Sequence, residues 1–225
     1  MTDIRAALSR WTTALERQVP IGGVIARNPA SHTSTAPTRS LLLRAATAWR
    51  SHDLLTQALI LYDSGHLLGA RILIRSAIES LAVLAYLNLQ MRGVVAGSVN
   101  FQDFAKRTRI LALGSRDGST EVAALSVMTI LEKVERRIAG LSSVYASLCE
   151  SAHPNHEGLV EGYLTFEDDG WTAKFSNKWS EKYKEGFESY VLVVAQLYYL
   201  EHDIEWSEAF AELEAWLSKN PQSVA

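Results

Sequence analysis

The chain has 225 residues, of which 48% are apolar and 21% are charged, with a formal net charge of -3. This balance is typical of a soluble globular protein, and it argues against a broadly basic surface, so there is no DNA-binding signal. The single cysteine, Cys149, excludes an internal disulfide framework and fits a reducing compartment. No signal peptide is visible, and the longest strongly apolar runs fall short of the roughly 20 residues that span a bilayer. We therefore expect a cytoplasmic protein with no membrane association.

Two short segments precede the main body of the chain. In the first, apolar residues recur at three- and four-residue steps: Ile4, Leu8, Trp11 and Leu15. This spacing predicts an amphipathic helix, so residues 1–18 are expected to form an N-terminal helical arm. Residues 19–37 contain three prolines, two glycines and several Ser and Thr, without a periodic apolar face. They predict a flexible connector.

Residues 38–218 are predicted to fold as one helical domain, with a tail at 219–225. A helix ending near Ser64, with Leu42 and Trp49 on its inner face, is followed by a second helix that runs to about Gly93. Gly65 between them can take a positive φ, so the two helices should form an antiparallel hairpin. The second helix is apolar on nearly every side, which predicts the centre of a bundle.

The remaining sequence predicts further helices at 100–113, 120–139, 141–153 and 180–218. Two short runs rich in aromatic and β-branched residues flank an Asp-Gly pair between the last two helices, which predicts a β-hairpin at 159–176. The predicted fold is therefore mainly α: an up-and-down helical bundle with a small β-hairpin before the last long helix. That helix ends in an apolar stripe that requires a partner surface, either the N-terminal arm or another protein: Trp206, Phe210, Leu213 and Leu217.

The central helix carries one polar line, formed by Arg71, Arg75 and Glu79 at four-residue steps. One interpretation is a structural ion pair, because charges in apolar surroundings persist when they are paired. The other is a functional polar pocket, in which Arg71, Arg75 and Tyr145 bind the ligand. The candidate catalytic residues of that pocket are Arg75, Glu79, Glu150 and His153.

The segment around His153 also allows other chemistries. A histidine at a helix C-terminus is favoured as a structural cap, and Pro154 ends this helix. His153, His156 and His202 are the candidates for a metal site, but Pro154 interrupts the spacing of a helical HExxH pair, so we assign no metal and no cofactor. Cys149 is a nucleophile candidate, although a lone cysteine in an apolar helix is more often a packing residue. Arginines expected on solvated faces are the candidates for phosphate contacts: Arg107, Arg109, Arg116, Arg136 and Arg137.

Two motifs carry a resemblance to a known group of proteins. They are Gly65-x4-Ala70-x2-Leu73-x-Arg75-x3-Glu79 and Tyr145-x2-Leu148-x-Glu150-x2-His153-Pro154, the second followed by the short hairpin. Together they resemble a bacterial family of unknown function that is similar to the HEPN-like helical proteins of toxin–antitoxin and phage-defence systems. The resemblance implies an up-and-down bundle, commonly dimeric, in which the polar residues of the central helix meet the His-bearing helix.

Active HEPN ribonucleases also place an arginine a few residues upstream of the catalytic histidine. In this chain the corresponding positions hold Ala146, Ser147 and Leu148. Arg27-Asn28-x3-His32 matches the pattern by letter, but Pro29 lies within it and the connector surrounds it. The missing arginine favours a non-catalytic member of the group.

Three functions follow as hypotheses. The first is a homodimeric HEPN-like binding or regulatory module in a bacterial stress or phage-defence system. The second is an enzyme that processes RNA or a nucleotide at the pocket around Arg75, Glu79, Glu150 and His153, with His153 as general acid or base. The third is a structural subunit that docks a partner through the apolar stripe of its last helix.

Overall fold

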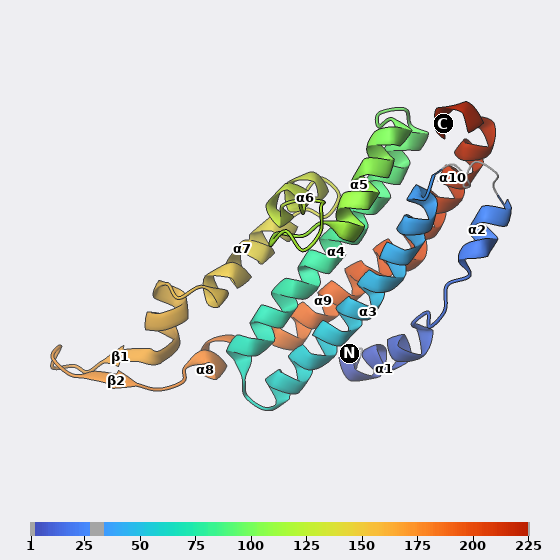
Figure 1. Cartoon of the computed structure of the whole chain (residues 1–225). Helices are drawn as coiled ribbons and strands as arrows, with labels where there is room; N and C mark the ends of the chain where they lie inside the picture. The colour runs from blue at the N-terminus through green and yellow to red at the C-terminus, as the bar shows by residue number, and fades with distance from the viewer. Residues whose placement is uncertain (1–2, 28–33, 225) are drawn as a thin grey trace.

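The computed structural model describes residues 3–27 and 34–224 of the chain (Figure 1). Its first half holds α1 Ile4–Ala14, α2 Ile21–Arg27, α3 Ala36–Asp63, α4 Leu67–Val95, α5 Phe101–Leu113, α6 Val127–Val134 and α7 Leu141–Ala152. Its second half holds the π-helix η2 His156–Glu161, the strands β1 Leu164–Phe166 and β2 Ala173–Phe175, α8 Trp179–Tyr183, α9 Phe187–Tyr199, the π-helix η3 Leu200–Glu205, α10 Trp206–Lys219 and the 3-10 helix η4 Pro221–Val224. The predicted mainly α fold with a small hairpin is confirmed.

Helix α4 is the centre of the bundle. It packs against α3, α5, α6, α7, α9 and α10, and Ile78, Leu81 and Leu84 on successive turns are fully buried. Among the described helices, α4 alone is long and apolar enough to cross a membrane by length and composition. However, 61% of its most apolar window is buried by the other helices, as in the core helix of a soluble protein.

The α3–α4 hairpin forms as predicted, but the first half of α3 buries a different face, whereas Leu55 and Ala58 of its second half are fully buried. Gly65 takes a φ of 80° in the turn. Leu42 and Trp49 are exposed rather than buried, and small residues such as Ala48 and Ser51 face the core instead. Small side chains allow the two long helices to approach closely, so burial follows backbone proximity here rather than side-chain size.

The N-terminal arm packs on α3 and α9. Ile4 and Leu8 are buried, and Arg5 of α1 forms ion pairs with Asp63 of α3 and with Glu188 of α9. The predicted connector differs from the structure, because residues Ile21–Arg27 form α2, and the buried side chain of Val24 anchors this helix. Residues 28–33 lie outside the described part of the chain.

Two other predicted segments form differently. The helix expected at 120–139 is reduced to α6, because residues 115–126 make an irregular turn closed by a bridge between Ser115 and Ala123. The expected first strand starts late, because residues 156–161 form η2, and the hairpin itself pairs Leu164 with Phe175 and Phe166 with Ala173.

The last long helix is divided into four parts, with Gly186 at a φ of 76° between α8 and α9. Its apolar stripe packs inside the chain against α4, and all four side chains are at most 5% exposed: Trp206, Phe210, Leu213 and Leu217. The partner surface that the sequence suggested is therefore covered by the chain itself.

Substituting Gly162, which precedes β1, should test the packing of this end of the bundle. A Cβ atom at Gly162 would lie 2.7–2.8 Å from the indole of Trp179, which is 1% exposed. We expect Gly162→Ala to lower the free energy of unfolding by about 1–3 kcal/mol, the usual cost of overpacking. Gly22→Ala in α2 is the control, because its Cβ would meet nothing within 4 Å. Urea denaturation of both variants measures the difference, and equal midpoints would contradict this packing.

Candidate functional site

Arg75 and Glu79 of α4 meet Tyr145 of α7. Arg75 Nη2 donates a hydrogen bond to Tyr145 Oη at 2.9 Å, and Tyr145 Oη donates to Glu79 Oε1 at 2.8 Å. Arg75 Nη2 also lies 3.5 Å from Glu79 Oε1. Arg75 Nε donates to Cys149 Sγ at 3.1 Å, so the guanidinium is held from several sides. The polar line of the central helix thus contacts α7 through Tyr145 and Cys149.

The Tyr145 phenol is held in its neutral form. Burial, together with the hydrogen bond to Glu79, raises the pKa of Tyr145 from 10.0 to about 12. The unfolded chain therefore releases this proton at a lower pH than the folded chain does. The stability that the phenol contributes is present below pH 10 and is lost as the pH rises towards 12.

Tyr145→Phe should remove the part of the pH dependence of folding stability that comes from this phenol. Between pH 10 and 12, the free energy of unfolding of the wild type should fall further than that of the variant. The difference should be on the order of 2 kcal/mol, since one pKa unit corresponds to about 1.4 kcal/mol. Urea unfolding at several pH values measures it, and parallel pH profiles would contradict the neutral, hydrogen-bonded phenol.

Arg71 is also fully engaged, one turn before Arg75. Its Nε donates to Ser151 Oγ at 2.8 Å, and Ser151 Oγ donates to Glu157 Oε1 at 2.7 Å. Its guanidinium lies 3.8 Å from the centre of the Tyr183 ring, within the range of a cation–π contact. Burial lowers the pKa of Arg71. These contacts join α4 to α7, η2 and α8. Arg71 therefore holds these elements together within the protein.

Glu150 and His153 do not join the Arg75 cluster. Both side chains are exposed, and Glu150 accepts a hydrogen bond from Asn155 at 2.5 Å. The His153 backbone N–H bonds to the carbonyl of Cys149 at the end of α7, which is the capping position. The four candidate catalytic residues are therefore brought together only in part, as the pair Arg75 and Glu79.

The candidate metal ligands lie in separate environments. His156 is 74% exposed beside Glu161 on η2, His153 ends α7, and His202 lies on η3 beside Asp203. Within residues 3–27 and 34–224, no group of three or more His, Cys, Asp or Glu side chains is placed to hold a metal ion. The Arg27–His32 pattern falls on side chains outside that description.

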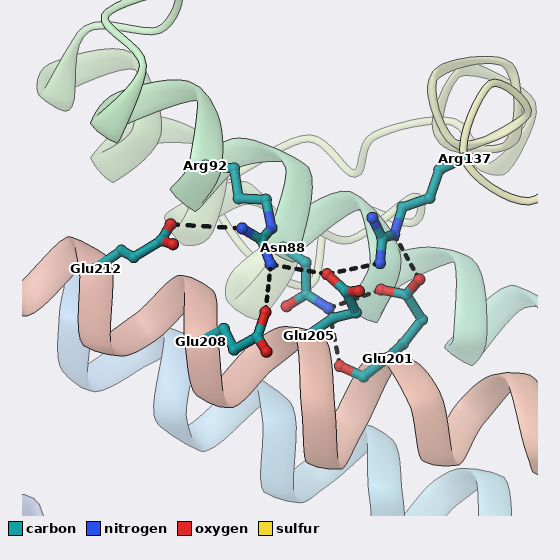
Figure 2. A network of polar contacts seen from close by, with 7 residues as sticks. All are labelled: Asn88, Arg92, Arg137, Glu201, Glu205, Glu208 and Glu212. Atoms are coloured by element: carbon teal, nitrogen blue, oxygen red, sulfur yellow. Dashed lines mark hydrogen bonds and ion pairs between the residues drawn. The ribbon is translucent and has the colours of Figure 1, made fainter.

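A second polar network surrounds the π-helix η3, and Figure 2 shows it. Glu201 is 1% exposed, and its Oε1 accepts from Arg137 Nε at 2.5 Å. Its Oε2 accepts from Asn88 Nδ2 of α4 at 2.8 Å, and the same amide donates to the Glu201 carbonyl at 2.9 Å. Arg137, predicted on a solvated face, therefore binds the most deeply buried carboxylate of this network.

Glu205 extends this network towards the surface. Its Oε2 lies 2.8 Å from both Arg137 Nη2 and Arg92 Nη2. Arg92 continues to Glu208 at 3.1 Å and to Glu212 at 3.4 Å (Figure 2). Burial raises the pKa of Glu205, but the two arginines outweigh burial and hold the pKa below its ordinary value. The network fastens η3 and α10 to α4 and to the α6–α7 turn, and its donors are used internally.

A pocket of about 430 Å³ opens between α1 and α9. The aromatic residues that line this pocket are Trp11 from α1 and Tyr198 and Tyr199 from α9. Trp11 and Tyr198 are in ring contact, with centroids 5.0 Å apart. The other walls are aliphatic groups of α1 and α9 and four polar side chains: Arg10, Gln196, His202 and Asp203. The volume lies in the range of small-molecule sites, and mostly apolar walls with a few polar groups are typical of them.

His202 supplies the buried polar part of this wall. Its ring stacks on Tyr198 at 5.6 Å, and its Nδ1 lies 3.1 Å from Asp203 Oδ1. Burial and the nearby charge of Arg44 lower the pKa of His202, so the imidazole is neutral at pH 7. Its Nε2 is shielded from solvent and has no hydrogen-bond partner. Such an unsatisfied buried group costs about 1–3 kcal/mol.

Comparison of the chain with protein-family models, curated proteins and solved structures found no match. The function therefore has to be argued from the geometry of these sites.

Sequence reasoning located the Arg71–Arg75–Glu79 line and Tyr145 but missed both the pocket and the η3 network. The pocket combines Trp11 with residues near Tyr199, and no local pattern connects segments so far apart in sequence. The network left a usable signal: Glu201, Glu205, Glu208 and Glu212 follow helical spacing, opposite Asn88 and Arg92 on α4.

Proposed function

We propose that this protein is a binding module whose ligand site is the pocket between α1 and α9, and that the ligand is a small planar heteroaromatic molecule such as a nucleobase or nucleoside. The observation that supports this is the combination of about 430 Å³ of space with the aromatic side chains of Trp11 and the exposed Tyr199, beside the His202–Asp203 pair. Aromatic walls favour stacking with a flat ring, and the polar side chains provide hydrogen-bonding partners for its edge.

The position of the pocket suggests how binding becomes a signal. One wall is α1, and the polar contacts that the structure describes between the N-terminal arm and the bundle include Arg5 to Asp63 and Glu188, His52 to Thr12 and to the Leu8 carbonyl, Arg44 to Glu16, and Trp49 to the Glu16 carbonyl. A ligand that contacts α1 and α9 together would strengthen the attachment of the arm. The proposed module therefore regulates through the position of its N-terminal arm.

The resemblance described above supplies the proposed cellular setting. The two motifs support a HEPN-like regulatory module of a bacterial stress or phage-defence system, located in the cytoplasm. RNA or a nucleotide remains part of this proposal as the source of the planar base.

We prefer binding over catalysis because the enzyme hypothesis requires Arg75 and His153 to line the same pocket. Arg75, its proposed phosphate clamp, donates to Tyr145 and Cys149 and is neutralised by Glu79, while His153 is exposed elsewhere on α7. RNA cleavage by the purified protein that disappears in His153→Ala would reverse this preference.

Native mass spectrometry of the full chain, purified gently from cells that express it, tests the proposal. We expect a bound small molecule with the absorbance of a heteroaromatic ring, released when the protein is denatured. The matched variant Trp11→Ala should retain markedly less of it, because Trp11 forms the α1 wall of the pocket. An adduct that Trp11→Ala retains in full would contradict the assignment of this pocket.

A further inference from the structure

The β1–β2 hairpin carries an apolar face whose aromatic side chains are left mostly exposed by the described residues. Leu164 pairs with Phe175 and Phe166 pairs with Ala173, so all four side chains lie on one side of the two strands. Thr165 and Lys174, also paired, lie on the other side. We call the first side, together with Trp171 of the turn, the arm face. In this subsection the arm is the β1–β2 hairpin, not the N-terminal arm.

The exposure of the arm face is unusual for such residues. Trp171 is 94% exposed, Phe175 78% and Phe166 64%. Figure 1 shows the hairpin projecting from one end of the bundle, beyond η2 and α8. An isolated two-stranded hairpin is marginally stable in water, and an alternating pattern of apolar and polar residues normally has its apolar side covered. The arm face therefore requires an apolar layer from outside its own chain.

The same chain carries a second uncovered apolar surface on α9 and η3. Tyr190 and Val193 of α9 are 43% and 51% exposed, and Leu200 and Ile204 of η3 are 40% and 42% exposed. Their spacing of three, seven and four residues keeps them on one side of the helix, and we call this surface the helix stripe. The pocket residues Leu192, Ala195 and Tyr199 lie on a different side, so the stripe is separate from the proposed ligand site.

We propose that two copies of this chain form a dimer by exchanging arms, so that the arm face of each copy covers the helix stripe of the other. Each chain supplies an uncovered apolar ribbon and an uncovered apolar helix face, and a two-fold dimer covers both at once. Large aromatic side chains bury about 150–250 Å² each, so the three aromatic side chains of each arm face bury roughly 900–1,500 Å² in the two contacts, and the stripe side chains beneath them add to this area. The total reaches the range of a stable interface of standard size, about 1,200–2,000 Å².

The charges around the hairpin turn distinguish a protein surface from other apolar partners. Glu167, Asp168 and Asp169 surround the turn next to Trp171. Glu167 pairs with Lys174, and the carboxylates of Asp168 and Asp169 oppose insertion into an anionic lipid surface and contact with nucleic-acid phosphates. The four side chains of the helix stripe are uncharged.

Light scattering coupled to size-exclusion chromatography tests the proposal with three full-length proteins. The wild type should be a dimer. The arm variant, Phe166→Ser with Phe175→Ser, and the stripe variant, Val193→Asp, should each be monomeric with unchanged helical circular dichroism. Controls on other exposed surfaces, Thr165→Gln on the polar side of the hairpin and Ala146→Asp on α7, should remain dimeric. A monomeric wild type, or a dimer that persists in both variants, would overturn the proposal.

Mixing the two monomeric variants distinguishes arm exchange from other arrangements. A heterodimer of the arm variant and the stripe variant keeps one intact contact of two, so mixing should restore dimers, with weaker affinity than the wild type. If mixing restores none, the arms pair with each other or with a different surface, and arm exchange is wrong.

A disulfide test does not depend on disrupting the interface. Phe175→Cys combined with Val193→Cys, in a Cys149→Ser background, should form a covalent dimer on mild oxidation. Each single-cysteine protein should form much less of it. Equal cross-linking of the protein carrying only Phe175→Cys would indicate contact between two arms and would contradict the exchange.

Discussion

Replacing Glu201 by alanine is expected to lower the free energy of unfolding by about 3 kcal/mol or more. The carboxylate is 1% exposed and accepts from both Arg137 and Asn88. Its removal deletes two hydrogen bonds to a buried charge, while Arg137 keeps Glu205 and Asn88 keeps the backbone carbonyl of residue 201. A hydrogen bond to a charged group contributes about 1.5–3 kcal/mol, so the loss of two accounts for about 3 kcal/mol or more.

Glu208→Ala provides the matched control for this substitution. Glu208 belongs to the same network through Arg92, but its side chain is 61% exposed. An exposed ion pair contributes about 0.2–1 kcal/mol, so the control should change the denaturation midpoint only slightly. Urea unfolding monitored by circular dichroism compares the two. If both variants lose the same small amount of stability, Glu201 does not hold η3 to α4 in the way described.

Filling the pocket with Ala195→Phe is expected to weaken ligand binding by about 100-fold, which corresponds to roughly 2.7 kcal/mol. Ala195 of α9 forms part of the pocket wall, and a phenyl group there would occupy the space assigned to the planar ring. Equilibrium dialysis with the ligand recovered from the native protein, or with adenosine as a probe, gives the dissociation constants.

The same substitution at an exposed position separates occlusion from general damage. Ala146 lies on the exposed side of α7, away from the pocket walls, so Ala146→Phe should bind as the wild type does. Both variants should keep the wild-type helical content. Undiminished binding by Ala195→Phe would place the ligand outside this pocket.

The sequence predicted the elements that depend on local signals. Gly65 marked the turn between α3 and α4, and the nearly uniform apolar character around Leu81 marked the central helix. The hairpin turn at Asp169-Gly170 was equally direct, with Gly170 at a φ of 69°. In each case a single residue type, or a single run of residues, is enough to indicate the element: glycine for a turn with positive φ, and apolar residues on every side for a buried helix.

Features that depend on tertiary contacts could not be predicted in the same way. The pattern of α3 favoured Trp49 as an inward residue, yet α3 buries small residues because α4 lies close to it. The π-helices η2 and η3 have no local sequence signature, although η3 sets which side of the last helix Glu201 and His202 occupy. The apolar stripe containing Trp206 was predicted to need the N-terminal arm or another protein as its partner surface, and the sequence could not indicate that α4 covers it.

The candidate site shows the same division. Arg75 and Glu79 were recognisable because charges are conspicuous on an apolar helix, and Tyr145 because it lies on the helix expected to face them. His153 was conspicuous by chemistry alone, and its position at the exposed end of α7 removes it from that cluster. Trp11, by contrast, reads as an ordinary apolar position of an amphipathic helix, and only the docking of α1 makes it a pocket wall.

A fluorine NMR titration of the full chain labelled with fluorotryptophan tests the central claim most directly. The six tryptophans report on separate regions, and Trp11→Phe identifies the signal of Trp11. On addition of adenosine, or of the ligand recovered from the native protein, we predict a saturable shift of the Trp11 signal, while the signal of Trp179, which packs on Gly162 and Tyr183, stays unchanged. A saturable shift of Trp179 without one of Trp11 would place the ligand at the hairpin end of the bundle, and no saturable shift of any signal would remove the binding function proposed for this pocket.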